Sequence, residues 1–103
     1  MGHGPEIIMD IDYVIRLCEG IGVVKKFEQD RTFFGNIELE IETPCKQTLC
    51  IISDRGMFSC YHIKTKILGE RRYIKPIINN NTDIEIYKLE DAIDLLKEYV
   101  NTI

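Results

Sequence analysis

In the segment 36–42, apolar and acidic side chains alternate strictly from Ile37 to Glu42, and this alternation constrains the fold more than any other feature of the chain. Successive side chains of an extended strand point to opposite faces, so one face of this segment is apolar and the other is acidic. A strand with one wet face is typical of antiparallel sheets, because the strands of parallel sheets are buried on both faces. The apolar positions are Ile37, Leu39 and Ile41, and the acidic positions are Glu38, Glu40 and Glu42.

Composition supports a sheet-rich domain. The chain has 103 residues, the length of a single domain, and contains 18 isoleucines but only one alanine, Ala92. Because isoleucine favours strands and alanine is the best helix former, this composition disfavours a helical bundle. Hydrophobic residues make up 45% and charged residues 29%, which is a globular composition, and we expect one domain over residues 9–103. Residues 1–8 are expected to be either a tag or a disordered native lead.

Both ends of this domain carry helical patterns. Asp10 is expected to cap a helix that continues to Glu19, because its carboxylate can accept the free N–H groups of the first turn. Gly20 and Gly22 provide a stop for this helix. A second helix is expected from about 89 to 101, without a serine or threonine cap. The inner face of the first helix is expected to contain Ile11, Val14, Ile15 and Cys18. The apolar stripe of the second contains Leu89, Ala92, Ile93, Leu96 and Val100.

Between the helices the pattern predicts further strands and a hairpin turn at 54–56, where Gly56 can adopt a positive φ. With a loop of these three residues, Cys50 lies directly opposite Cys60. The two hairpin strands do not alternate simply, so we expect both of their faces to be covered. The predicted fold class is therefore α+β, an antiparallel sheet of about five to six strands with an N-terminal and a C-terminal helix packed on it. Besides 36–42, the expected strands are 23–28, 47–53, 57–64, 72–78 and 83–87.

Four cysteines in a chain of this length fall short of the density of a disulfide scaffold. Three alternatives follow: buried free thiols, which we favour, a disulfide between Cys50 and Cys60, or a zinc site. Zinc usually takes two tight ligand pairs, and the sequence has no C-x2-C pair, so the spacing is wrong in detail. No catalytic motif is present, and we expect a protein that is not an enzyme and holds no cofactor. The candidate zinc ligands are Cys45, Cys50, Cys60 and His62.

The segment 64–75 contains five cations against one glutamate, so its charge is +4. Since the net charge of the chain is −4, the remaining residues carry −8. A compact basic surface on an acidic protein indicates a site for an anionic partner, because arginine and lysine bind phosphate and carboxylate groups. The candidate binding residues are Lys64, Lys66, Arg71, Arg72, Tyr73 and Lys75.

The leading functional prediction is a small domain that binds another protein, of the inhibitor, immunity or adaptor type. The composition of the chain, which contains many isoleucines, several asparagines and little alanine, is typical of the AT-rich genes of viruses and mobile elements. The alternatives are nucleic-acid binding through the segment 64–75 and a small zinc-stabilised domain. No run of apolar residues is long enough for a membrane span and no signal segment is visible, so we expect a cytoplasmic protein without membrane contact. Either 36–42 or 72–78, which contains Pro76, is a candidate edge strand for a dimer.

Overall fold

A computed structural model of the chain describes residues 9–30, 35–65, 72–77 and 85–102. Its centre is a five-stranded antiparallel sheet in which neighbouring strands follow one another along the chain, and this confirms the predicted α+β fold. The expected strand 83–87 is replaced in its described part by a single bridge between Ile86 and Phe58. The elements are α1 (Ile11–Leu17), β1 (Val23–Gln29), β2 (Ile37–Glu42), β3 (Thr48–Asp54), β4 (Met57–Thr65), β5 (Arg72–Ile77) and α2 (Leu89–Val100).

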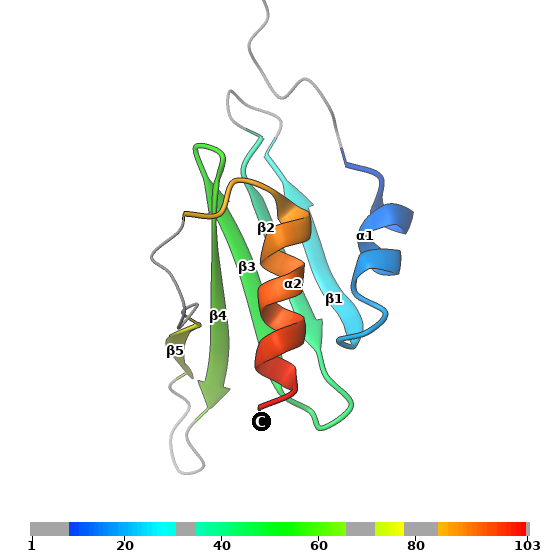
Figure 1. Cartoon of the computed structure of the whole chain (residues 1–103), viewed down its shortest axis with the longest axis vertical. Coiled ribbons are helices and arrows are strands. Elements are labelled where there is room, and N and C mark those ends of the chain that lie inside the picture. Colours follow the sequence, from blue (N-terminus) through cyan, green and yellow to red (C-terminus); the bar gives the residue numbers. More distant parts are fainter. Residues whose placement is uncertain (1–8, 31–34, 66–71, 78–84, 103) are drawn as a thin grey trace, which may run out of the picture.

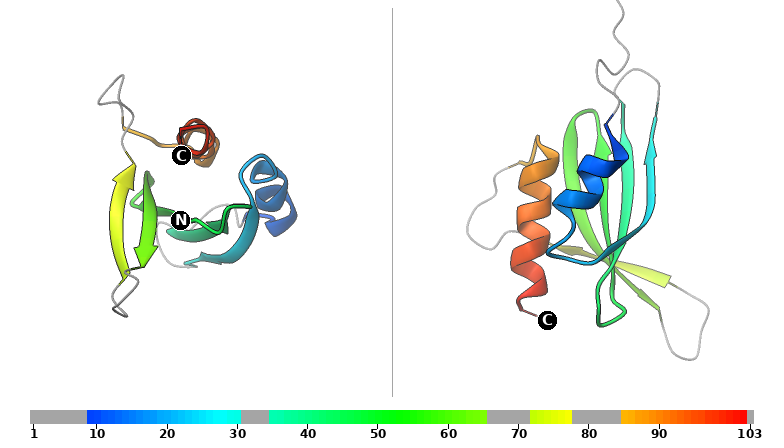
Figure 2. Two further views of the ribbon diagram at one scale, coloured as in Figure 1. Left: turned by 90° about the horizontal axis from the view of Figure 1, so that it is seen from below. Right: turned by 90° about the vertical axis from the view of Figure 1, so that its right-hand side faces the viewer.

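Both helices lie on the same side of the sheet, which curves around them (Figure 1 and Figure 2). We call the side under the helices the covered face and the other side the open face. The expectation that both faces of the β3–β4 hairpin are covered is wrong, because Ile52 is 36% exposed and Ser59 is also exposed on the open face. Neither helix is long and apolar enough to cross a membrane, within the part of the chain that the structure describes.

The alternating pattern of β2 sets the covered face. Ile37, Leu39 and Ile41 are almost completely buried, as the sequence predicts. Antiparallel register extends this apolar layer to Leu49 and Ile51 of β3, which lie opposite Ile41 and Leu39. The residues that complete the layer come from α1, the turn after it and α2, and they are Val14, Cys18, Ile21, Leu89, Ile93, Leu95 and Leu96.

Helix α2 crosses the middle of this layer, and its predicted stripe is confirmed with Val100 only half buried. The only alanine of the chain, Ala92, is fully buried there. The thiol of Cys60 on β4 donates a hydrogen bond to the Ala92 carbonyl at 3.6 Å. A methyl side chain lets the helix backbone approach the strand closely enough for this contact. Lys88 precedes the helix without a side-chain cap, as expected.

Helix α1 begins where predicted, since the Asp10 side chain accepts from the Asp12 N–H at 3.0 Å. Its inner face is narrower than the sequence pattern indicates. Val14 and Cys18 are buried, but Ile11 and Ile15 are 42% and 44% exposed. This helix has only seven residues and lies beside β1 at the margin of the sheet (Figure 1), so the sheet contacts only one edge of the apolar stripe.

The β3–β4 turn differs from the expected three-residue loop. Asp54 pairs with Met57, so the loop consists of Arg55 and Gly56 alone. Both have positive φ, 56° and 84°, which matches the twist of a two-residue hairpin. The register therefore shifts by one residue from the expected one.

The strand order also decides which strands have a free edge. β2 lies between β1 and β3, so the segment 36–42 cannot be an edge strand for a dimer, contrary to that expectation. β5 pairs only with β4 and is an edge of the described sheet, which agrees with Pro76 in its sequence.

A close backbone contact fixes the entry to β1, and it leads to a stability prediction. A Cβ at Gly22 would lie 2.1 Å from the Glu42 carbonyl oxygen, whereas a Cβ at Gly20 would meet only the flexible end of Lys97 at 3.4 Å. We expect Gly22→Ala to lower the free energy of unfolding by about 3 kcal/mol or more, because backbone must move to relieve the overlap. The matched variant Gly20→Ala is expected to change it by less than about 0.5 kcal/mol. Equal effects of both variants in urea unfolding would contradict this packing.

Candidate functional site

The open face of the sheet brings apolar and acidic side chains together. Antiparallel partners share a face, so the register defines rows that run across the strands. Ile52 is exposed, Tyr61 and Ile63 are half buried, and Cys50 is buried even though neither helix covers it. The three rows are Glu28–Glu38–Ile52–Ser59, Lys26–Glu40–Cys50–Tyr61 and Val23–Glu42–Thr48–Ile63.

The carboxylates of this face gather on the β1–β2 side. Lys26 contacts both Glu38, at 3.1 Å, and Glu28, at 3.9 Å, and the hydrogen bond to Glu38 raises the pKa of Lys26. Among the residues that the structure describes, Glu40 forms no ion pair. A further pair joins Lys25 to Glu42 at 3.7 Å. Two lysines thus face four glutamates, so this side of the open face is net negative.

One end of the open face is hollowed. A shallow depression of about 590 Å³ lies where β1, β2 and β3 meet at the end nearer the hairpin turn. Ile52 contributes an apolar wall, and Glu28 and Glu38 contribute carboxylates. The remaining lining residues are Gln29, Asp30, Asn36, Ile37 and Ser53.

The basic segment predicted from the sequence lies only partly within the described residues. Lys66 and Arg71 lie outside them. The backbone register places Arg72 opposite Thr65, Tyr73 opposite Lys64 and Lys75 opposite His62, so the two strands do bring the segment together. Binding of an anionic macromolecule by this surface stays a prediction of the sequence.

The four candidate zinc ligands do not converge. All four cysteines are free thiols, with Cys45 exposed and the others buried. In the observed register Cys50 lies opposite Tyr61, and Cys60 lies opposite Ile51, so Cys50 and Cys60 lie on opposite faces and the expected direct pairing is wrong. Within the described ranges, no group of three His, Cys, Asp or Glu side chains is arranged to hold a metal ion.

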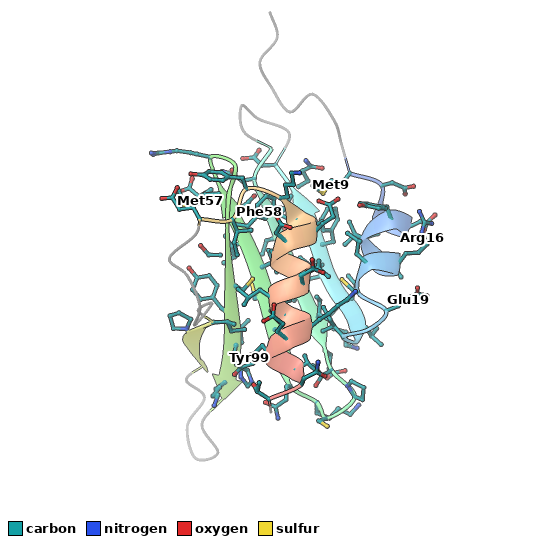
Figure 3. All side chains as sticks on the ribbon, viewed as in Figure 1. Met9, Arg16, Glu19, Met57, Phe58 and Tyr99 are labelled. Carbon is teal, nitrogen blue, oxygen red and sulfur yellow. The ribbon has the colours of Figure 1, made fainter. Side chains whose placement is uncertain are left out.

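His62 is an ionisable residue that is almost completely buried, with 3% exposure. Its Nε2 lies 2.7 Å from Gln47 Oε1, and its Nδ1 lies 2.5 Å from the Tyr99 hydroxyl. Since an amide oxygen only accepts, Nε2 carries the proton, and the hydroxyl then donates to Nδ1. The Tyr99 ring also meets the imidazole edge-on, with centroids 5.5 Å apart. Figure 3 shows Tyr99 at the C-terminal end of α2, on the side of β4.

A second opening, which we call the end pocket, lies beside this imidazole. Its volume is about 390 Å³, and it is lined by the β2–β3 connection, the second half of β4 and the end of α2. These parts meet at the end of the molecule where α2 finishes (Figure 1). The lining residues are Thr43, Pro44, Cys45, Gln47, His62, Lys64 and Val100.

Sequence reasoning singled out His62 and Cys45 but missed Gln47, Thr43 and Tyr99. The hydrogen-bond partners of His62 are 15 and 37 residues away along the chain. No local spacing connects them, because the Tyr99 contact exists only when α2 lies across β4 and the Gln47 contact only when β3 pairs with β4. A histidine at an inward position of a strand was the one available signal, since a buried imidazole needs polar partners.

The His62 contact gives a stability prediction. Tyr99→Phe keeps the ring but removes the hydroxyl that donates to His62, and we expect the free energy of unfolding to fall by about 1–2 kcal/mol. Tyr13→Phe is the matched control, because its hydroxyl binds Glu90 on the exposed surface and its loss should cost much less. A Tyr99→Phe effect no larger than that of the control, measured by denaturant unfolding, would contradict the buried contact.

The buried thiols predict a loss of stability at alkaline pH. Burial raises the pKa of Cys18 from 9.0 to about 11 and that of Cys60 to about 12. The unfolded chain therefore loses these protons near pH 9 while the folded chain keeps them. The stabilisation is complete below pH 9 and declines as the pH rises toward 12, by up to about 1.4 kcal/mol per pH unit for one thiol. We expect Cys60→Val to show a shallower decline than the wild type between pH 8 and 11, and an identical decline would be inconsistent with a buried thiol at this position.

The described part of the chain therefore has two candidate sites of different character. The open face is broad, partly apolar and acidic, whereas the end pocket is small and contains Lys64 beside His62. Comparison of the chain with protein-family models, with curated proteins and with solved structures gives no match.

Proposed function

We propose that this protein is a small, non-enzymatic protein-binding domain of the inhibitor, immunity or adaptor type, and that it holds its partner on the open face of the sheet. The observation that carries the proposal is the combination, on one face that neither helix covers, of a partly exposed apolar centre with an acidic margin. Apolar area beside a charged margin is the composition of a protein interface.

The apolar part lies on β3 and β4. Ile52, Tyr61 and Ile63 keep part of their surface in water, and they flank the buried Cys50. Covering an exposed isoleucine side chain contributes on the order of 1.5 kcal/mol. A partner that covers these three residues together gains a hydrophobic centre from which water is excluded.

The acidic part lies on β1 and β2 and defines the chemistry of the partner. Its surplus of glutamates attracts a basic protein surface and repels nucleic acid. In the hollow, a lysine or arginine of the partner can lay its apolar stem on Ile52 and bring its cation to Glu28 and Glu38. The preferred partner is therefore a protein surface with apolar side chains flanked by lysine or arginine.

The free thiols of the four cysteines support the proposal that the protein binds its partner in a reducing compartment. Cys18, Cys45, Cys50 and Cys60 form no disulfide, and disulfides are rare in the cytosol. The proposal accordingly places the protein and its partner in the cytoplasm.

The test is affinity capture from the native source with variants of the open face, followed by binding measurements on the recovered partner. Ile52→Glu is expected to weaken binding about 30-fold, because it puts a charge at the apolar centre. Glu40→Lys is expected to slow association and to change its salt dependence, because it reverses a charge of the margin.

Two exposed positions away from the face provide matched controls. Ile15→Glu makes the same replacement on α1, and Glu98→Lys makes the same charge reversal on α2. Both are expected to bind like the wild type. Loss of binding in Ile15→Glu rather than Ile52→Glu would move the interface to α1, and a nuclease-sensitive interaction with a steep salt dependence would favour the basic segment instead.

A further inference from the structure

We propose that the end pocket binds a small organic carboxylate, with Lys64, Gln47 and Thr43 as its donors. This site is separate from the open face, and the chemistry of its lining differs from that of the rest of an acidic protein.

The pocket wall is built before any ligand arrives. The β2–β3 connection is closed by hydrogen bonds from Thr43 N–H to the Gln47 carbonyl and from Lys46 N–H to the Thr43 carbonyl, both 2.9 Å. The Thr43 hydroxyl accepts from the Gln47 N–H at 3.1 Å, and Lys46 adopts a φ of 65° to make the bend. The other wall contains His62, which Tyr99 and Gln47 hold in place. Such preorganisation lowers the entropic cost of binding.

The residues that line the pocket include hydrogen-bond donors. The Oε1 atom of Gln47 accepts from His62, which leaves its Nε2 amide group to donate. The Thr43 hydroxyl accepts from a backbone N–H and keeps its own proton for a ligand. Lys64 adds an ammonium group and, among the described residues, forms no ion pair.

The charge of the lining selects the ligand. No carboxylate is present among the described residues that line the pocket, although the chain as a whole carries a net charge of −4. One ammonium group balances one negative charge, which fits a carboxylate better than a phosphate with nearly two. The side chains of Val100 and Pro44 provide an apolar wall for the body of the ligand. A volume of about 390 Å³ suits a small molecule.

The test is a titration of the isotope-labelled full chain by two-dimensional NMR with sodium butyrate, inorganic phosphate and sodium chloride at matched ionic strength. Butyrate is expected to cause saturable shifts confined to residues 43–47, 62–64 and 99–100. Shifts with butyrate that are no larger than those with chloride, or that spread over the whole surface, would overturn the proposal. Tighter binding of phosphate than of butyrate would overturn the assignment of a carboxylate.

Three lysine variants show whether the charge in the pocket carries the binding. Lys64→Gln is expected to raise the Kd for butyrate about tenfold or more, because it removes a charged donor. Lys64→Arg keeps the charge and should restore most of the affinity. Lys88→Gln makes the same charge change at the opposite end of α2 and should leave the Kd unchanged. Equal affinities of Lys64→Gln and Lys88→Gln would overturn the proposal.

Cys45 provides a second readout, since it is exposed and lines the same pocket. Alkylation of its thiol by neutral iodoacetamide is expected to slow when butyrate is present, in the wild type and in Lys88→Gln but much less in Lys64→Gln. An alkylation rate that butyrate does not change in the wild type would show that the ligand binds elsewhere. The open-face variant Ile52→Glu should bind butyrate normally, which separates this site from the proposed protein interface.

Discussion

Packing of α2 across the covered face of the sheet is the interaction on which the rest of the structure depends. Every second side chain of β2 is buried on the covered face. Leu89, Ile93 and Leu96 of α2 pack against this layer. Transfer of such side chains out of water is the main favourable contribution to folding. The single alanine lies where the Cys60 thiol reaches the helix backbone.

This packing also explains why a histidine is buried at the margin of the core. His62 continues the covered row after Leu49, but at the end of α2 the apolar layer ends and Tyr99 meets it instead of a leucine. A buried imidazole requires polar partners, and the tight β2–β3 connection places Gln47 on its other side. His62 and Gln47 also line the end pocket, so the same residues form the edge of the core and the wall of a candidate ligand site.

Because one face of the sheet is committed to the helices, the other is left for water or for a partner. The two candidate sites differ in sign: the open face has surplus carboxylates, whereas the end pocket contains an unpaired ammonium among the described residues. Charges of opposite sign on separate surfaces allow a protein partner and a small anion to bind without competing for the same residues.

The sequence by itself determined the fold class, both helices, all five strands to within a residue at each end and the acidic side of β2, because each follows from local periodicity and propensity. It could not determine which half of the α1 stripe is buried, the one-residue shift that separates Cys50 from Cys60, or which strands are edges. Those properties depend on how elements pair. Only the tertiary structure decided the partners of His62 and the contents of the end pocket, because these contacts join residues far apart in the chain. The Gln47 contact forms when β3 pairs with β4, and the Tyr99 contact forms when α2 docks on β4.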